Sequence, residues 1–324
     1  MKALRLHAPG DLRLHDEPAP EPAPGEVLLR VGAVGLCGSD RHWLVEGAIG
    51  DAVLTEPLVL GHEFVATIES GPRAGERVAV DPASPCGRCA PCVEGLTHLC
   101  RNLRFAGHGT TDGALRTLMA WPERLAHPIA DDLPSPEGTL LEPLGVALHA
   151  LDLGRVAVGA TAGVFGCGPI GLLLVRLLRL AGANVVVADP LPHRLSAAEA
   201  LGASPDPGEV AVAFEVAGTD EALEATLAAV RPGGRVVLVG IPDGDRTSFT
   251  ASTARRKGLT LLLSRRMGPL DLPRAIGLVE SGQVELGGLV TERHHLSHWP
   301  DAFAALSERR GLKVVVEPGG DAPS

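Results

Sequence analysis

The sequence predicts an α/β protein with two domains, a β-rich first domain and a second domain built around a parallel sheet. Up to about residue 148 the chain contains short β-type runs, such as 27–34 and 77–81, separated by turns rich in proline and glycine. From about Leu151, apolar strands alternate with helices rich in alanine and leucine, which is typical of a parallel sheet with helical crossovers. The 324 residues are enough for two domains with substantial cores.

The composition argues against two classes of partner. The formal net charge is -10, whereas the phosphates of a nucleic acid demand a basic face. The longest apolar stretch follows Gly171, and Arg176 and Arg179 interrupt it before it reaches membrane-spanning length. The N-terminus alternates like a strand and lacks the apolar run of a signal peptide. We therefore expect a soluble, cytoplasmic protein with no nucleic-acid or membrane partner.

Four cysteines of the first domain have the spacing of a closed zinc site. They are Cys86, Cys89, Cys92 and Cys100, in a loop rich in proline and glycine that has little apolar material to pack. Four thiolates in one short segment can meet at the Zn–S distance of about 2.3 Å of a tetrahedral site. Disulfides or space-filling cysteines are the alternatives, and the lack of a secretory signal argues against disulfides. Four thiolates leave no vacant position, so we expect a structural zinc.

A second, looser set of residues predicts a metal site with a free position. Cys37 lies in the segment 35–40, His62 and Glu63 follow one another, and Glu142 lies in the segment 141–144. A thiolate, an imidazole and one or two carboxylates can hold zinc and leave a position for water or an alcohol. Taken singly, each residue is better explained as a buried cysteine, a strand histidine or a solvated carboxylate. Their order on the chain, and the motif that comes after them, favour the metal site.

A nucleotide-binding pattern comes next. The apolar run 162–165 leads into Gly166-Cys167-Gly168-Pro169-Ile170-Gly171 and a helix to about Ala181, and a second apolar run, 184–188, ends in Asp189. This is the strand, G-x-G-x-x-G, helix, strand, acid order of a dinucleotide site. The glycines allow a pyrophosphate to approach the N-terminus of the helix closely. Asp189 would accept hydrogen bonds from ribose hydroxyls and repel a 2'-phosphate, which favours NAD over NADP.

With these motifs together, the chain resembles the zinc-dependent medium-chain dehydrogenase/reductase family, in its sorbitol and polyol dehydrogenase branch. The resemblance covers nearly the whole chain and implies a Rossmann-type parallel sheet domain plus a GroES-like β-barrel catalytic domain. It implies a catalytic domain over 1–148, an NAD-binding domain over 149–264, and a return of 265–324 to the catalytic domain, with a helix over 265–282. The segments that carry it are 35–42, 58–63, 86–100, 141–144, 166–171, 214–218, 231–240 and 313–316.

The resemblance also implies a catalytic site. Cys37, His62 and Glu63 would bind the catalytic zinc, with Glu142 bonded through water or exchanging with Glu63. Both arrangements of the carboxylates occur among relatives, so the direct ligand stays open. Glu142 in place of a cysteine points to the polyol branch rather than to simple alcohol dehydrogenases.

The implied reaction transfers a hydride from a secondary alcohol to NAD. Ser39 and His42 would carry the alcohol proton to solvent, and Asp40 would hold the ring of His62. The expected cofactor contacts are Gly166, Gly168, Pro169, Ile170, Gly171, Asp189, Arg194, Val216 and Gly240.

Substrate choice is less constrained by the residues. Trp43, Phe105 and Arg265 are the expected substrate contacts. Arg266 replaces an aromatic residue usual in the family, so it either serves an anionic sugar or is a surface charge. An aldose 1-dehydrogenase or a threonine or butanediol dehydrogenase is the alternative within the family. A zinc-free reductase or a non-catalytic nucleotide-binding protein is the alternative of another class, and the Cys37 set argues against it.

One segment departs from the family pattern, and two further expectations concern the C-terminal tail and the oligomeric state. After residue 203 a strand and a helix usual in the family are missing, so we expect intact pyrophosphate and nicotinamide sites and weakened adenine binding. The tail from Pro318 is too short and polar to hold structure. We expect a homo-oligomer, a tetramer or dimer, by analogy alone.

Overall fold

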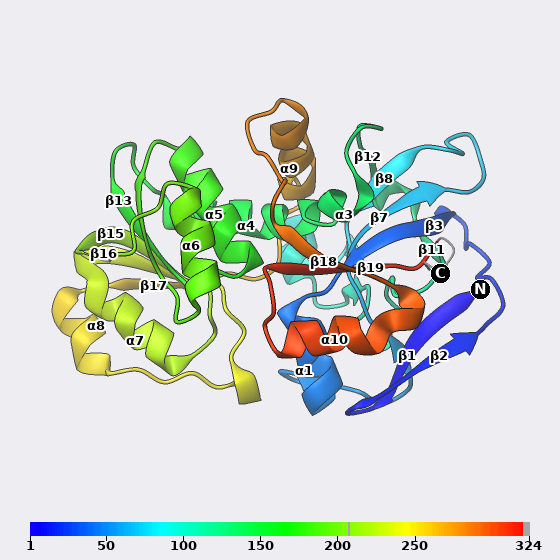
Figure 1. Ribbon diagram of the computed structural model, residues 1–324, viewed down its shortest axis with the longest axis horizontal. Coiled ribbons are helices and arrows are strands. Elements are labelled where there is room, and N and C mark those ends of the chain that lie inside the picture. Colours follow the sequence, from blue (N-terminus) through cyan, green and yellow to red (C-terminus); the bar gives the residue numbers. More distant parts are fainter. Residues whose placement is uncertain (207, 320–324) are drawn as a thin grey trace. The chain divides into compact units, whose positions relative to one another are not determined.

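The chain folds as two units, one built on a mixed sheet and the other on a parallel sheet (Figure 1). The structure, a computed structural model, describes residues 1–206 and 208–319. The first unit comprises Met1–Glu142 and the chain from Leu286 onward, and the second comprises Pro143–Glu285. Pro207 of the shortened segment and residues 320–324 of the polar tail lie outside the described residues.

The first unit is rich in strands, as the alternating runs predict. Its strands are β1 (Lys2–Ala8), β2 (Asp11–Asp16), β3 (Glu26–Gly35), β4 (Ala48–Ile49), β5 (Ala52–Val53), β6 (Leu58–Val59), β7 (Glu63–Ile68), β8 (Arg77–Val80), β9 (Ala83–Ser84), β10 (Arg104–Phe105), β11 (Leu118–Pro122), β12 (Ala126–Pro128), β18 (Val290–His295) and β19 (Lys313–Glu317). Its helical segments are α1 (Gly38–Glu46), α2 (Ala90–Val93), η1 (Thr97–Leu99), η2 (Glu123–Leu125), α3 (Ser135–Gly138), η4 (Leu296–His298) and α10 (Trp299–Ser307).

Strand β3 is the centre of the largest sheet. The sheet has the order β12-β8-β7-β3-β19-β18, and β11 also pairs with β3. Strands β7 and β19 lie antiparallel to β3 on its two sides, and at the end of β3 Gly35 pairs with Glu63 of β7 and with Val315 of β19. Residues from distant parts of the chain therefore meet at the end of β3.

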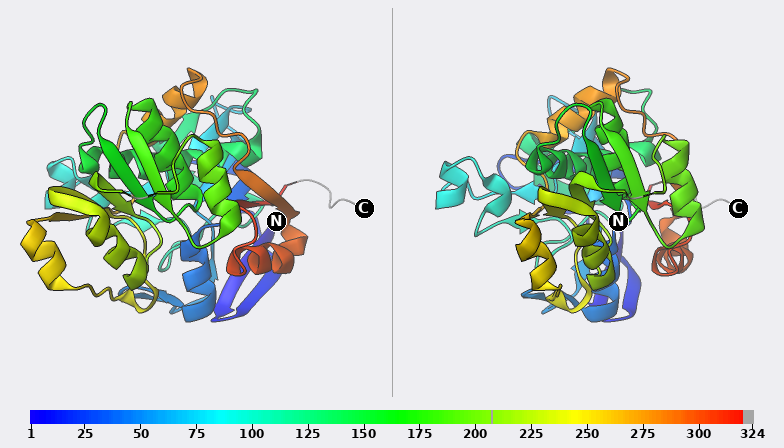
Figure 2. Two further views of the ribbon diagram at one scale, coloured as in Figure 1. Left: turned by 60° about the vertical axis from the view of Figure 1, so that its left-hand side comes forward. Right: turned by 90° about the vertical axis from the view of Figure 1, so that its left-hand side faces the viewer.

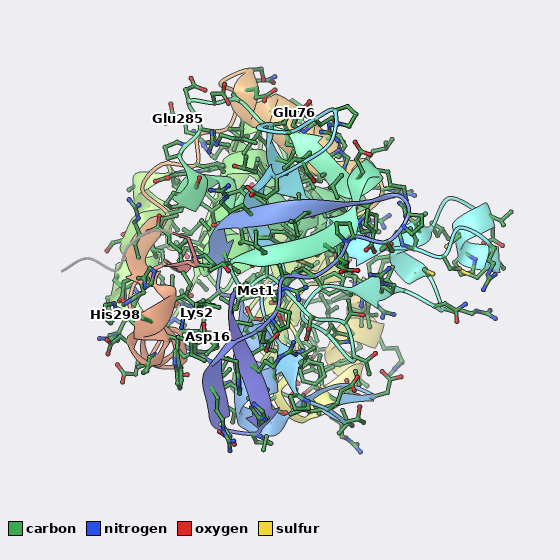
Figure 3. The ribbon with its side chains drawn as sticks, turned by 90° about the vertical axis from the view of Figure 1, so that its right-hand side faces the viewer. Met1, Lys2, Asp16, Glu76, Glu285 and His298 are labelled. Carbon is green, nitrogen blue, oxygen red and sulfur yellow. The ribbon has the colours of Figure 1, made fainter. Side chains whose placement is uncertain are left out.

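A separate hairpin packs on the same core. Strand β1 pairs with β2 and with β6, and the ammonium of Lys2 binds the carboxylate of Asp16 at 2.7 Å (Figure 3). Apolar side chains of the hairpin, such as Leu4 and Leu6, are fully buried in a core cluster that also contains Phe64 and Trp121. The alternation that predicts a strand at the N-terminus is thus explained by burial of one face.

The second unit alternates strands and helices around a parallel sheet. Its sheet has the order β14-β13-β15-β16-β17, and Figure 2 shows these strands with helices beside them. The elements are α4 (Leu141–Gly154), whose first two residues belong to the first unit, β13 (Thr161–Phe165), α5 (Pro169–Leu180), β14 (Asn184–Ala188), α6 (Pro192–Ala200), β15 (Val210–Glu215), α7 (Asp220–Ala229), β16 (Val230–Leu238), η3 (Asp243–Asp245), α8 (Ala251–Lys257), β17 (Thr260–Leu263) and α9 (Asp271–Glu280).

The strand order reverses around β13, and we call the region at the carboxyl ends of β13 and β15 the crevice. From β13 the chain passes through α5 to β14 on one side, and it then returns to β15 on the other side of β13. Because such crossovers are right-handed, α5 and α7 cover opposite faces of the sheet. Ligands of open parallel sheets bind at this kind of switch point. The glycine loop that follows β13 lies there.

The shortened segment leaves a small remnant at the sheet edge. Ser204 forms an isolated parallel bridge with Val186 of β14, with backbone hydrogen bonds of 2.8 and 2.9 Å. Strand β15 begins six residues later, at Val210. The bridge occupies the edge position beside β14, where a further strand would extend the sheet.

The two units divide at residues 142/143 and 285/286, whereas the sequence predicts boundaries at 148/149 and 264/265. Helix α9 belongs to the second unit, in which its Arg274 binds Asp152 of α4 at 2.6 Å. Helix α9 is also shorter than the predicted 265–282. Pro269 disfavours helical geometry at Gly268, and the Asp271 carboxylate accepts the Gly268 N–H at 2.7 Å, so the helix begins at Asp271.

The helices of both units fall short of what a bilayer requires. Across residues 1–206 and 208–319, no helix combines the length and the apolar character needed to cross a membrane.

Candidate functional site

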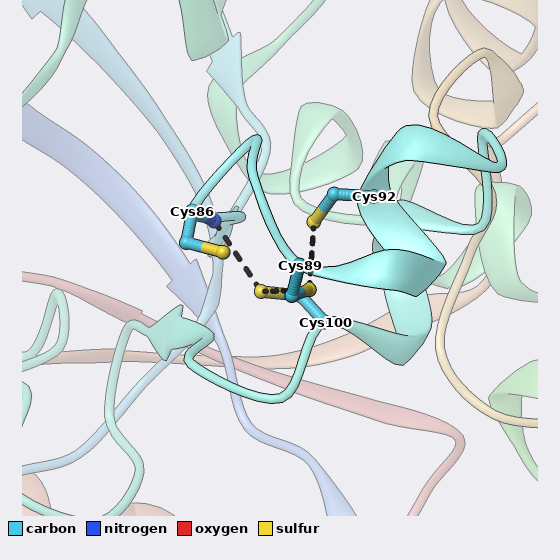
Figure 4. A group of neighbouring side chains, drawn as sticks. All are labelled: Cys86, Cys89, Cys92 and Cys100. Atoms are coloured by element: carbon cyan, nitrogen blue, oxygen red, sulfur yellow. Dashed lines mark hydrogen bonds between the residues drawn. The ribbon is translucent and has the colours of Figure 1, made fainter.

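Two groups of side chains in the first unit have the composition of metal sites. The first group is the cysteine quartet, whose segment projects as a lobe with the short helices α2 and η1 (Figure 3). Its four sulfur atoms lie within 4.8 Å of one another, and Figure 4 shows them turned toward a common point. The sulfurs of Cys89 and Cys92 are 3.4 Å apart, far beyond the S–S bond length of about 2 Å. The four residues are thus placed to share a metal ion rather than disulfides.

The electrostatics of the quartet suit a metal that binds thiolates. Backbone N–H groups of Arg88 and Cys89 lower the pKa of the Cys86 thiol to about 6. Burial, followed by the neighbouring thiols Cys89 and Cys100, raises the pKa of the Cys92 thiol to about 12. Four clustered thiols cannot all ionise without a cation, whereas a zinc ion would hold all four as thiolates. The donor set therefore fits a closed zinc site.

The second group consists of Cys37, His62 and Glu63. One sulfur, nitrogen or oxygen atom from each lies within 4.8 Å of the others. Cys37 is the residue that precedes α1, and His62 and Glu63 lie where β7 begins. Gly61 makes the turn before His62 with φ of 93°, and a Cβ atom there would lie 2.8 Å from Val34. The glycine is therefore needed to place His62.

Asp40 joins the two segments that carry these side chains. Its buried carboxylate accepts the backbone N–H of Cys37 at 2.9 Å and that of Gly61 at 3.2 Å. The same carboxylate lies 3.7 Å from Nδ1 of His62, which is longer than a hydrogen bond. Asp40 thus links the segment that carries Cys37 to the one that carries His62, through backbone hydrogen bonds.

Ser39 and His42 lie on the same short helix, α1. The hydroxyl of Ser39 is 3.4 Å from Nε2 of His62, so Ser39 borders the group. His42 is buried, and its Nδ1 contacts the carboxylate of Glu46 at 2.8 Å. Glu46 was not among the residues predicted from the sequence. Its i,i+4 spacing from His42 is the signal in the sequence, because residues four apart lie on one face of a helix such as α1.

Glu142 lies near the group but is not one of the three residues within 4.8 Å. Burial raises the pKa of its carboxyl to about 8. The nearby His62 offsets part of the increase, and the charges of Glu63 and Cys37 add to it. Burial, followed by the charge of Glu63, also raises the pKa of the Cys37 thiol to about 12. A divalent cation would reverse both shifts, because it favours the charged ligand forms. Sulfur, nitrogen and carboxylate donors in this setting fit zinc.

Lys313 is a residue of this site that was not predicted from the sequence. It is 2% exposed, and its ammonium forms an ion pair with Oε2 of Glu63. It opens β19, the strand beside β3. A lysine at the start of the apolar run 314–316 is the signal in the sequence, because a buried lysine needs a carboxylate partner.

The three predicted substrate residues lie in three different environments. The ring of half-buried Phe105 lies 5.5 Å from the ring of His62. Trp43 is 1% exposed and belongs to the core, where its ring meets His108 edge-on at 5.3 Å. Arg265 is an exposed residue of the second unit, and Arg266 beside it adopts φ of 59°.

The predicted cofactor residues surround the crevice of the second unit. Gly166 has φ of 106°, and a Cβ atom there would lie 2.9 Å from the backbone nitrogen of Ala217. Gly168 precedes the first residue of α5, Pro169, while a Cβ at Gly171 would collide with the carbonyl oxygen of Gly166. The loop is thus held tightly at the end of a strand, with the N-terminus of α5 facing the crevice. This cradle fits a pyrophosphate.

The acidic residue of the pattern is tied to the glycine loop. Asp189 follows β14, and its carboxylate accepts the backbone N–H of Cys167 at 2.7 Å and that of Leu191 at 2.8 Å. Arg194 also approaches the loop, since its guanidinium lies 3.6 Å from a Cβ built on Gly168. The negatively charged Asp189 and the positively charged Arg194 therefore both lie beside the glycine loop.

The end of β15 completes the crevice. Val216 donates its backbone N–H to Phe165 at 2.8 Å. Gly240 lies so close to Gly218 that a Cβ atom would collide with its backbone. The buried carboxylate of Glu215, for which no role was predicted from the sequence, accepts the N–H groups of Ala217 and Gly218 at 2.8 and 2.7 Å. It stabilises the turn that faces the glycine loop.

Two protein families match segments of the chain, one in each unit, and both agree with the geometry described above. The alcohol dehydrogenase GroES-like domain matches residues 23–131, in the first unit. The zinc-binding dehydrogenase family matches residues 204–281, in the second unit.

Individual proteins are similar over nearly the full length. Sorbitol dehydrogenase of Bacillus subtilis (strain 168) is 33% identical, with 98% of this chain and 97% of the relative covered. A zinc-binding dehydrogenase of Sinorhizobium meliloti 1021, solved with NADP, is 32% identical with a TM-score of 0.88, covering 98% of this chain and 99% of that one. An alcohol dehydrogenase of Escherichia coli CFT073, solved with NADH, is 27% identical with a TM-score of 0.88 and the same coverage. The chain therefore belongs to the zinc-dependent medium-chain dehydrogenase/reductase family, in the branch that includes sorbitol dehydrogenase.

Proposed function

We propose that the protein oxidises a secondary alcohol of a polyol or sugar-derived substrate with NAD, at a zinc ion held by Cys37, His62 and Glu63. The observation that carries the proposal is the grouping of these three donors within 4.8 Å, in a buried setting bordered by Ser39. Three protein ligands with a free fourth position are the usual arrangement of a catalytic zinc. The similarity to a sorbitol dehydrogenase supports a polyhydroxylated substrate.

When bound, zinc supplies a positive charge that lowers the pKa of an alcohol hydroxyl, and NAD supplies the acceptor for the hydride. The protein's own residues position the ligands and handle the proton. Asp40 holds the backbone of Cys37 and of Gly61 by hydrogen bonds, and its carboxylate lies 3.7 Å from Nδ1 of His62. Phe105, whose ring lies beside that of His62, offers an apolar wall against which a substrate carbon chain can pack.

The proton of the alcohol needs an acceptor and a route to solvent. Ser39 borders the group, so its hydroxyl can accept that proton and pass its own on. The contact of His42 Nδ1 with Glu46 at 2.8 Å fixes the orientation of its ring, and an imidazole can exchange a proton near neutral pH. We assign the relay to Ser39 and His42, with Glu46 orienting the histidine.

We assign the second zinc to Cys86, Cys89, Cys92 and Cys100. Four thiolates leave no room for a substrate, so this zinc has a structural role. Its lobe has few buried apolar residues of its own, since Val93, Leu96 and Leu99 are exposed. The metal replaces the missing apolar core of the segment.

We assign NAD to the crevice of the second unit. Asp189 lies beside the glycine loop, where we expect it to accept hydrogen bonds from the ribose and its charge to disfavour a 2'-phosphate. The neighbouring Arg194 favours anionic groups, so the preference for NAD is a balance between the two side chains. The short edge at Ser204 argues for weaker binding of the adenine than of the pyrophosphate.

We also propose a cytoplasmic homo-oligomer, a dimer or a tetramer, by analogy with relatives. Light scattering of the zinc-loaded protein measures the mass and decides between these states.

The test is a substrate panel with the zinc-loaded protein and NAD, followed by NADH absorbance. The panel contains sorbitol, xylitol and other polyols, aldoses, sugar acids, sugar phosphates, threonine and 2,3-butanediol. Oxidation of a neutral polyol above the others supports the proposal, and a preference for an aldose, threonine or butanediol replaces it within the family. Binding of NAD and zinc without oxidation of any compound contradicts the substrate class. Failure to bind NAD favours a non-catalytic protein.

A further inference from the structure

The buried lysine at the metal group is not explained by the proposed function. Lys313 and Glu63 are each 2% exposed, and their side chains form an ion pair. Burying two charges costs free energy that their attraction offsets only in good geometry, so a buried ion pair is a weak source of stability. Its location points to a role at the metal group instead.

The route of the lysine side chain depends on Gly35. Gly35 pairs with Glu63 on one side and with Val315 on the other, and Lys313 lies two residues before Val315. Because side chains alternate along a strand, Lys313 projects from the same face as Val315. A Cβ atom on Gly35 would collide with Oε2 of Glu63 and would lie 2.8 Å from Cε of Lys313. The lysine therefore reaches Glu63 across a strand position that only glycine leaves open.

The ammonium and the carboxylate that the proposed zinc site uses therefore lie in direct contact inside the first unit.

We propose that Lys313 is a positioning residue that holds Oε2 of Glu63, so that the carboxylate can bind the metal only through Oε1. The inference rests on the proposed zinc site. A carboxylate that is free to rotate can bind a metal through both oxygens and fill an additional position. By restricting Glu63 to one oxygen, Lys313 keeps the position for the alcohol open.

The experiment compares Lys313→Met with the matched variant Lys313→Arg, which keeps the charge. Cobalt replaces zinc in the catalytic site, because cobalt reports its coordination number in its visible spectrum. We expect Lys313→Met to show the weaker absorption of a five-coordinate ion, while Lys313→Arg keeps the strong tetrahedral band. Release of the metal to a chelator should be slower in Lys313→Met than in the unmodified protein. We expect kcat/KM to fall about 10–100-fold, the usual range when a group that supports a metal ligand is lost.

An unchanged cobalt spectrum in Lys313→Met would overturn the proposal, and so would faster release of the metal. If Lys313→Met does not fold, Lys313→Gln keeps a hydrogen-bond donor without the charge, and its spectrum is judged by the same two outcomes. The spectrum and the release rate need no substrate, so they stay informative if the substrate panel fails. If cobalt does not bind at the Cys37 group at all, the proposed zinc site itself is wrong.

Discussion

The two metal-binding groups of the first unit differ in how the chain builds them. The quartet comes from one short segment, in a lobe with exposed apolar residues. The group of Cys37, His62 and Glu63 comes from the end of one strand and the start of another, and a lysine from near the C-terminus completes its surroundings. A metal can thus replace a core where the chain has none, whereas a reactive metal needs a core around it.

Removing a ligand of the buried group should abolish most of the turnover. His62→Ala should reduce kcat by at least about a thousandfold, because the metal supplies several kcal/mol of stabilisation to the transition state. NAD binding and the quartet zinc should persist, because neither depends on His62. Activity assays, zinc content and NAD titration check this. The control is His298→Ala, an exposed histidine of the same unit, which should keep full activity. Full turnover by zinc-poor His62→Ala would refute the assignment.

The second prediction concerns the local order of the lobe that carries the cysteine quartet. Cys92→Ser should abolish the local order of residues 86–100, because metal binding supplies the folding free energy of such segments. We expect protection of their backbone N–H groups to fall by more than about a thousandfold in hydrogen exchange. Zinc content should drop from two to one per chain. Turnover measured directly after purification should persist at least in part. Unchanged protection in the lobe would show that its order does not depend on zinc.

A third prediction links the buried group to the sheet. Gly35→Ala should separate Glu63 from Lys313, since the added Cβ would collide with the carboxylate. We expect a loss of about 1–3 kcal/mol in unfolding free energy, the usual cost of overpacking, and a fall in turnover of about tenfold. The control is Gly38→Ala, where the added atom meets open space. Denaturant unfolding and kinetics check both effects, and equal behaviour of the two variants would contradict the steric argument.

The smallest effect is a difference in thiol reactivity between the two groups. In metal-free protein the Cys86 thiol has its pKa lowered to about 6, while burial holds the pKa of the Cys37 thiol at about 12. An acid is ionised above its pKa, so at pH 7 Cys86 is a thiolate and Cys37 a neutral thiol. Alkylation at pH 7, followed by peptide mass spectrometry, should modify Cys86 more than about a hundredfold faster. The Cys86 reaction should slow below about pH 6. Equal rates at pH 7 would contradict the difference in environment.

Much of the fold follows from local patterns. The run 184–188 becomes β14, the predicted strand 27–34 becomes β3 with one more residue at each end, and the predicted helix to about Ala181 becomes α5. These patterns work because strand and helix periods are set by burial of one face. The helix predicted over 265–282 was too long, since Pro269 and the Asp271 contact outweigh the apolar pattern before it.

The quartet and the glycine loop could be recognised from local spacing, because each needs only residue types with specific chemistry close together in one segment. The sequence also indicated Cys37, His62 and Glu63 as a set. How that set is supported follows from contacts between distant parts of the chain. The pairing of Gly35 with Glu63 and Val315 brings Lys313 to the carboxylate, and Asp40 joins two segments through backbone N–H groups. Such contacts depend on strand register, which is set by how the whole sheet buries its faces rather than by spacing along the chain.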